Sequence, residues 1–137
     1  MDVVVKEGPS LDAGQVLSLY QDAGWSFYTK HMDDLMSAIG NSSLVLSAWL
    51  DQELAGLVRI LTDGHFIIYV QDILIKEKHR RLGIGTLLLT KALERVGEVR
   101  QIVLLTDDTP MTRGFYEKLG FSSCDRGDLV SFVRMKR

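Results

Sequence analysis

The 137-residue sequence predicts a mixed α/β (α+β) fold with a mostly antiparallel central sheet, one parallel strand-helix-strand crossover and about four flanking helices. Two observations lead to this prediction. Three β-rich runs follow one another with short turns between them, which is typical of antiparallel strands. A helical segment then joins two apolar strands, and a right-handed crossover of this kind makes the strands parallel. The length is that of one domain, so we expect residues 1–137 to form a single domain.

A strand and two helices are expected ahead of the main sheet. Residues 3–6 are rich in valine and predict a short strand, which a Gly-Pro pair ends. Ser10 is a candidate N-cap for a helix over 11–23. Apolar residues at helical spacing predict a second helix from 29 or 30 to 39.

The main sheet begins with three strands, expected over 44–50, 54–61 and 65–75. The residues from Asp51 to Glu53 predict the first hairpin turn. Asp63 and Gly64 form a dipeptide that is a strong signal for the second turn. These three strands are therefore expected to be antiparallel neighbours.

The second half of the chain predicts the crossover and the end of the fold. An apolar helical face extends over 86–97, and the continuous apolar strand over 101–106 should lie parallel to the strand before it. Thr109 caps a helix that continues to Leu119, with Pro110 in its first turn. A closing hairpin is expected over 124–135.

Composition limits the classes of partner and cofactor. The formal net charge of −2 gives no general basic surface for nucleic acid, so any positive site must be local. Cys124 is the only cysteine, and the histidines have no metal-ligand spacing, so we expect no metal. No apolar run approaches the ~20 residues of a membrane span, and the N-terminus has no signal-peptide pattern. A cytoplasmic protein without membrane partners is expected.

The stretch Lys78-His79-Arg80-Arg81 runs into Gly83 and Gly85, and a helix follows. A helix N-terminus binds anions, and glycines allow phosphate oxygens to approach the backbone. The stretch is also compatible with a solvated turn. A dinucleotide fold is a further alternative, with Asp107 placed to hold a ribose, but Leu88 occupies the position of its third glycine.

Residues 80–85, Arg-Arg-Leu-Gly-Ile-Gly, resemble the R-x-x-G-x-G/A signature of the GNAT superfamily of acyl-CoA-dependent N-acetyltransferases. Residues 72–75 resemble the central strand of that family, and 115–121 resemble the end of its late helix. The expected order of elements also matches. The resemblance implies transfer of an acetyl group from acetyl-CoA to a primary amine, by direct attack in a ternary complex.

The resemblance also implies how the cofactor is held. The pyrophosphate would lie on the backbone of the signature loop, and the pantetheine arm would pair with the central strand. Arg80 and Lys78 would contact the outer phosphates, and Thr109 stands where many members have an asparagine. The implied cofactor-binding residues are Ile73, Leu74, Ile75, Lys78, Arg80, Arg81, Leu82, Gly83, Ile84, Gly85, Thr86, Thr109 and Arg113.

Two catalytic residues follow from the same resemblance. Tyr116 stands where the family often has a tyrosine that protonates the leaving thiolate, with packing beside Phe115 as the alternative. An alkylammonium must lose a proton before it attacks, and a carboxylate can take it directly or through water. Asp72 is the best-placed candidate for this base, and Asp107 and Asp108 are alternatives.

The acceptor is expected to be a small-molecule or peptide amine. The stretch from Trp25 to Tyr28 forms either an aromatic wall for this acceptor or part of the core. A set of aspartates, Asp107, Asp108, Asp125 and Asp128, would favour a cationic acceptor. The alternatives are a non-catalytic acyl-CoA-binding domain and a nucleotide-binding oxidoreductase. The protein is expected to be a monomer or a homodimer.

Overall fold

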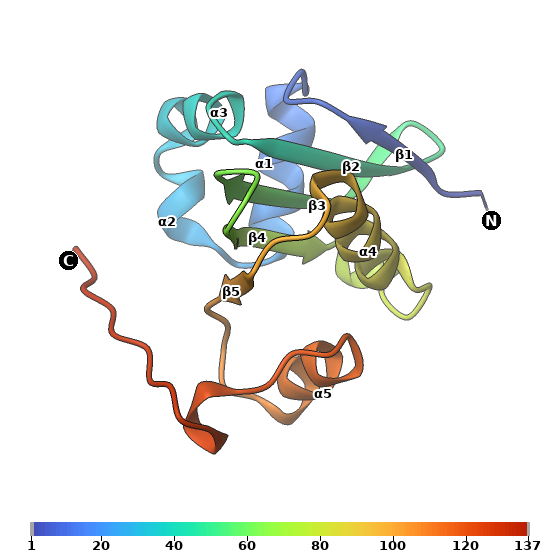
Figure 1. The fold of residues 1–137 in the computed structure, drawn as a ribbon. Coiled ribbons are helices and arrows are strands. Elements are labelled where there is room, and N and C mark those ends of the chain that lie inside the picture. Colours follow the sequence, from blue (N-terminus) through green and yellow to red (C-terminus); the bar gives the residue numbers. More distant parts are fainter. Residues whose placement is uncertain (1, 137) are drawn as a thin grey trace. The chain divides into compact units, whose positions relative to one another are not determined.

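The computed structural model describes residues 2–136 (Figure 1). The chain forms two compact units, the first ending at Leu105 and the second beginning at Thr106. The single domain expected from the chain length stays a prediction. No helix within 2–136 is both long and apolar enough to cross a membrane.

The first unit is built on a five-stranded sheet in the order β1-β2-β3-β4-β5. Its strands are β1 (Val4–Glu7), β2 (Leu44–Leu50), β3 (Glu53–Thr62), β4 (Ile67–Ile75) and β5 (Gln101–Leu104). Neighbouring strands are antiparallel from β1 to β4, while β5 pairs with β4 in parallel. The expected hairpins and the parallel crossover are therefore confirmed, and with them the mixed, mostly antiparallel sheet.

Helices cover both faces of this sheet. The first unit contains α1 (Ala13–Asp22), α2 (Ser26–Thr29), α3 (Met32–Gly40), the 3₁₀ turn η1 (Glu77–His79) and α4 (Ile84–Val96). In Figure 1, α4 lies in front of the sheet and α1 lies behind it. Two apolar layers result, one on each face of the sheet.

Register partners show how the two layers are separated. Leu57 and Leu74 are partners on β3 and β4, and both belong to the core cluster that α1 and α3 complete. Gly56 and Ile75, the next pair, face α4, where a Cβ on Gly56 would lie 2.6 Å from Ile75 Cδ1 and 3.3 Å from Leu88 Cδ1. Glycine at 56 therefore leaves the room in which Ile75 packs against α4.

Three local expectations need correction. Helix α1 begins at Ala13, and its N-cap is Asp12 and not Ser10, because the Asp12 carboxylate accepts a hydrogen bond of 3.0 Å from the Gln15 N–H. The helical segment before Gly40 is divided into α2 and α3. The turn between β3 and β4 is longer than the expected Asp63-Gly64 pair and covers four residues, 63–66. Asp63 Oδ1 stabilises this longer turn by accepting hydrogen bonds from three successive backbone N–H groups at 2.8–3.1 Å.

The second unit contains helix α5 (Pro110–Lys118) and a 3₁₀ turn, η2 (Cys124–Arg126). Thr109 is the N-cap of α5 as expected, and it forms a reciprocal capping box with Thr112. The closing hairpin is wrong, since no strand is present from 106 to 136. Residues 124–126 form a 3₁₀ turn where the hairpin needs an extended strand, and an isolated two-stranded hairpin is only marginally stable.

Candidate functional site

The glycine loop leads directly into α4. Gly83 is the N-cap, and its φ of +78° lies in the left-handed region that favours glycine. The helix begins at Ile84, two residues earlier than expected. The backbone N–H groups of its first turn have no acceptor within the helix, and they carry the positive end of the helix dipole. This loop therefore has the backbone geometry of an anion-binding site.

The basic stretch before the loop is divided between two locations. Lys76, Lys78 and His79 all contact Glu53 at the start of β3, at 3.0, 3.0 and 2.7 Å. Arg80 is exposed, and its Nε donates a hydrogen bond of 3.3 Å to the backbone carbonyl of Ile75, at the end of β4. The charge available to a ligand on the loop thus belongs mainly to Arg80 and its exposed neighbour Arg81.

Beyond its midpoint, β4 has one open edge within the first unit. Strand β5 pairs with β4 only from Ile67 to Val70, whereas β3 pairs with β4 as far as Ile75. In the part of the first unit that the structure describes, no strand lies on the other side of β4 over 73–75. Such an edge presents backbone N–H and C=O groups to an extended ligand. Since Arg80 contacts Ile75, the open edge leads to the glycine loop.

Asp72 lies on the same strand, but its carboxylate is buried in a polar cluster. Its side chain is 2% exposed and forms an ion pair with Arg59, its register partner on β3, at 2.8 Å. Tyr20 donates a hydrogen bond of 2.9 Å to the Oδ2 that Arg59 also contacts. Tyr28 donates one of 2.8 Å to Oδ1. Both carboxylate oxygens are therefore occupied by donors from α1, α2 and β3.

A bulge in β4 adjoins this cluster. Arg59 pairs with Asp72, whereas Ile60 pairs with Val70, so Gln71 is the extra residue. Its exposed side chain donates a hydrogen bond of 3.1 Å to the Tyr28 hydroxyl. Bulges are frequent next to active sites, where they redirect a side chain. Here the bulge places an exposed amide beside a buried carboxylate, with one tyrosine hydroxyl between them.

The aromatic stretch from Trp25 to Tyr28 is divided between the core and the surface, and its expected role as a wall for the acceptor stays a prediction. Tyr20, Trp25 and Tyr28 pack with ring centroids 5.2–6.1 Å apart, as a core cluster would. Phe27 is 71% exposed and lies against His31, 4.8 Å between ring centroids. Burial is the main cause that raises the pKa of Tyr28, and the charge of Asp72 raises it further.

In the second unit, Tyr116 lies on α5 between Phe115 and Phe121, with ring centroids 5.0 and 5.7 Å away. Burial raises the pKa of Tyr116, while a hydrogen bond with Thr106 acts in the opposite direction. The phenol therefore keeps its proton at neutral pH.

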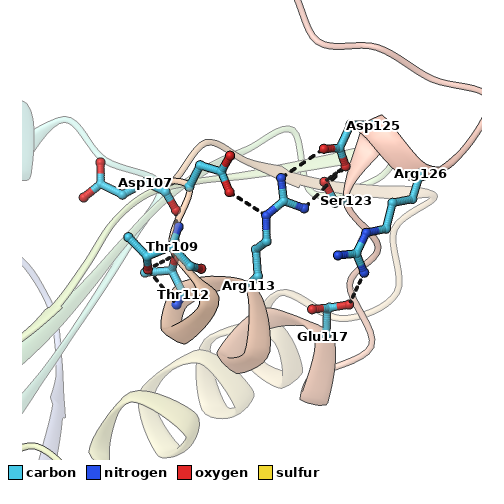
Figure 2. A network of polar contacts seen from close by, with 9 residues as sticks. Asp107, Thr109, Thr112, Arg113, Glu117, Ser123, Asp125 and Arg126 are labelled. Carbon is cyan, nitrogen blue, oxygen red and sulfur yellow. Dashed lines mark hydrogen bonds and ion pairs between the residues drawn. The ribbon is translucent and has the colours of Figure 1, made fainter.

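Polar contacts surround Arg113 on the same helix (Figure 2). Arg113 Nε donates to Asp108 at 2.6 Å, and its Nη2 donates to Asp125 at 3.0 Å. The hydrogen bond with Arg113 is the main cause that lowers the pKa of Asp108. Thr109 uses its hydroxyl to accept the backbone N–H of Thr112 at 3.1 Å. Each of these side chains thus has a partner within the second unit.

Residues 14–121 match the family model described as the acetyltransferase (GNAT) family. The chain belongs to the GNAT acetyltransferase family. A solved structure of a GNAT family acetyltransferase from Streptococcus pneumoniae TIGR4 is 29% identical, covers 99% of each chain and has a TM-score of 0.87. Other solved structures match the fold at lower sequence identity.

Two of these solved structures have more specific names. A ribosomal-protein-alanine N-acetyltransferase from Brucella melitensis is 21% identical, with 98% of this chain and 100% of the other covered and a TM-score of 0.73. An aminoglycoside acetyltransferase from an uncultured soil metagenomic sample is 20% identical, with 100% of both chains covered and a TM-score of 0.72. At these identities the likeness concerns the fold alone.

Within this GNAT chain, the sequence-predicted residues fall into three groups. Those at 73–75 and 80–86 lie along the open edge of β4, in the glycine loop and in the first turn of α4, and Lys78 lies just before the loop in η1, where it pairs with Glu53. Asp72 is on β4 but faces the α1–α2 side of the sheet, where Tyr20 and Tyr28 contact it. Thr109, Arg113 and Tyr116 belong to the second unit.

Sequence reasoning missed three residues that partner the predicted ones, Tyr20, Glu53 and Arg59. It named Tyr28 within the aromatic stretch, but not as a partner of Asp72. Arg59 carried the clearest signal, because an arginine in the middle of an apolar strand requires a buried partner.

Proposed function

We propose that this GNAT protein transfers the acetyl group of acetyl-CoA to a primary amine, by direct attack in a ternary complex. The observation that carries the proposal is the open edge of β4 over 73–75, which leads to the N-terminus of α4. The pantetheine arm of CoA, with its two amides, is complementary to the open edge of β4, and the pyrophosphate is complementary to the N-terminus of α4. We infer that Arg80 contacts further phosphate oxygens.

The chemistry requires a polarised carbonyl, a neutral amine and a leaving thiolate. Backbone N–H groups at the open edge of β4 supply donors for a developing oxyanion. A thiol has a pKa of ~8.5, so the thiolate leaves readily and proton donation gives further help. Tyr116 is our proposed donor, and its raised pKa supports this role because the phenol remains protonated.

The base is the carboxylate of Asp72 in this proposal. Arg59 and Tyr20 hold it in the interior, and Tyr28 connects it to the exposed Gln71 amide. Asp108 is less suitable, because it lies in the second unit, whereas Asp72 lies on β4 itself, directly before the open edge. We infer that the acceptor is a small-molecule or peptide amine that meets the cluster from the side of Gln71.

An amine panel assayed for CoA release from acetyl-CoA tests the function. We expect release with at least one primary amine, and a higher melting temperature with acetyl-CoA than with adenosine. Gly83→Ala should weaken acetyl-CoA binding, because alanine is strained at a φ of +78°. Gly40→Ala is the matched control, since Gly40 ends α3 and an added Cβ has no heavy atom within 4 Å.

Two results would contradict the proposal. Stabilisation by acetyl-CoA with no CoA release on any amine indicates a non-catalytic acyl-CoA-binding domain. Stabilisation by NAD(P)H and not by acetyl-CoA indicates a nucleotide-binding protein.

A further inference from the structure

The Asp72 carboxylate is too enclosed to meet an acceptor amine directly. Its side chain is 2% exposed, and it accepts hydrogen bonds from Arg59, Tyr20 and Tyr28 at 2.8, 2.9 and 2.8 Å. A direct contact with an amine would require one of these donors to leave. Loss of Arg59 or Tyr20 would also leave polar groups unpaired in the interior, which costs free energy.

The two tyrosines that hold this carboxylate differ in one respect. Tyr20 is 0% exposed, whereas Tyr28 is half-buried. The Tyr28 oxygen donates its proton to Asp72 and accepts a hydrogen bond of 3.1 Å from the exposed Gln71 amide. A weaker contact of 3.4 Å comes from Arg59. The hydrogen-bonded path from the surface to Asp72 therefore passes through the Tyr28 hydroxyl.

The position of this path suits an acceptor. Gln71 is the bulge residue of β4, two residues before the open edge begins at Ile73. An amine that takes the place of the Gln71 amide would donate an N–H to the Tyr28 oxygen. Its nitrogen would then lie next to the part of β4 where the proposed acyl group is bound.

We propose that Tyr28 is a catalytic residue that relays the acceptor's proton to Asp72, an inference that rests on the proposed function. The acceptor ammonium gives one proton to the Tyr28 oxygen, which frees the lone pair that forms the C–N bond. The Tyr28 O–H proton moves at the same time to Asp72 Oδ1, so the phenol is regenerated. The C–S bond breaks, and the thiolate takes a proton from Tyr116. The Tyr116 phenolate is reprotonated through solvent by the second proton that the nitrogen releases as it becomes an amide. Asp72 returns its proton to solvent by the reverse path.

The electrostatics around Tyr28 fit a relay. The charged and titratable groups that face it are Asp72 on β4, Arg59 on β3 and Tyr20 on α1. Burial and the charge of Asp72 raise the pKa of Tyr28, so its hydroxyl stays protonated and able to donate. Arg59 and Tyr20 are positioning residues, because they contact the carboxylate and not the acceptor.

The test compares Tyr28→Phe with Tyr20→Phe, using the best amine of the panel. Each variant removes one hydroxyl donor from Asp72, but only Tyr28 reaches the exposed side. We expect Tyr28→Phe to lower kcat by ~10²-fold with little change in KM, which is the size of a general-base contribution. Tyr20→Phe should lower the melting temperature and reduce kcat by less than about tenfold.

The pH profile adds a readout that a structural role would not change. Below the amine pKa of ~10, the neutral fraction rises about tenfold per pH unit. The kcat of Tyr28→Phe should rise with pH in this way up to about pH 9.5, whereas wild-type kcat should be flatter. Fluorotyrosine at position 28 keeps the ring shape and acidifies the phenol. This variant should therefore fold, and its profile of kcat against pH should be shifted from that of the wild type.

Four outcomes would overturn the relay. Equal kcat losses in Tyr28→Phe and Tyr20→Phe would assign both tyrosines to structure. Wild-type kcat in Tyr28→Phe, or an unchanged profile with fluorotyrosine, would remove Tyr28 from the proton path. Absence of CoA release by the wild-type protein on every amine would overturn the proposed function and the relay together. CoA release by the wild type combined with any of the other outcomes would overturn the relay alone.

Discussion

At the scale of single residues, the Arg59–Asp72 pair is the most enclosed charge in the sheet. The two side chains are 6% and 2% exposed, and they lie on adjacent strands that pair in register. Burial acts to lower the pKa of Arg59, but the charge and hydrogen bond of Asp72 outweigh it, and the pKa is raised. The Arg59 guanidinium therefore depends on the Asp72 carboxylate as its buried partner.

Removal of one partner from this pair should be more damaging than removal of both. Arg59→Met leaves Asp72 as an uncompensated buried charge, and we expect a loss of about 3–5 kcal/mol in the free energy of unfolding. The double variant Arg59→Met, Asp72→Leu should recover part of that loss, since neither charge remains. Urea denaturation of the wild type, both single variants and the double variant measures the coupling. Additive losses would show that the two groups do not stabilise each other.

At the scale of elements, Glu53 connects the start of β3 to the turn before the glycine loop. Its carboxylate contacts Lys76 at the end of β4, and Lys78 and His79 in η1. Hydrogen bonds with His79, then Lys78 and Lys76, lower the pKa of Glu53 to about 2. The contacts hold η1 beside the hairpin from which β3 begins, and so position the chain that enters the loop.

This lowered pKa gives a pH prediction with a definite sign. The unfolded carboxyl titrates near 4.5 and the folded one near 2, so its stabilising contribution is complete above pH 4.5 and lost as pH falls to 2. Glu53→Gln should therefore melt below the wild type at pH 7, and the difference should close by about pH 2. Thermal melts from pH 7 to pH 2 measure this difference in melting temperature between the wild type and Glu53→Gln. A gap that is constant with pH would show that the charge of Glu53 does not contribute.

How well the sequence predicts each element depends on how local its signal is. The strands, the crossover and α5 were predicted because apolar periodicity, turn residues and the Thr-Pro cap lie within the element itself. The cap of α1 was wrong because Ser10 and Asp12 are both good caps two residues apart, and the residue types alone do not distinguish them. The closing hairpin was wrong because a strand also needs a partner, which its own residues do not specify.

The candidate site shows the same division. The glycine loop was predicted, since its glycines and arginines are consecutive in the chain. The cluster around Asp72 was not, because its donors lie 13, 44 and 52 residues away in sequence. Only the register of β3 and β4 and the packing of α1 and α2 bring these side chains together.

At the scale of the whole molecule, the net charge of −2 opposes a polyanionic ligand. Attraction to such a ligand must come from local positive charge. Lys76 and His79 are held by Glu53, and Lys78, although 63% exposed, shares the same partner. Within the described residues, Arg80 and Arg81 are the exposed cations of this stretch that form no ion pair. Binding of CoA should therefore depend strongly on a small number of arginines and on the salt concentration.

Arg80→Ala should weaken CoA binding by about 10- to 100-fold, the size expected for hydrogen bonds to charged groups. Dephospho-CoA should lose less affinity in this variant, because Arg80 is proposed to contact the outer phosphates. Titration calorimetry at two salt concentrations measures both effects. Arg95→Ala is the matched control, since Arg95 is an exposed arginine near the other end of α4, paired with Glu7 at 2.9 Å. Equal affinity losses in the two variants would indicate a general effect of net charge, and would remove Arg80 from the phosphate site.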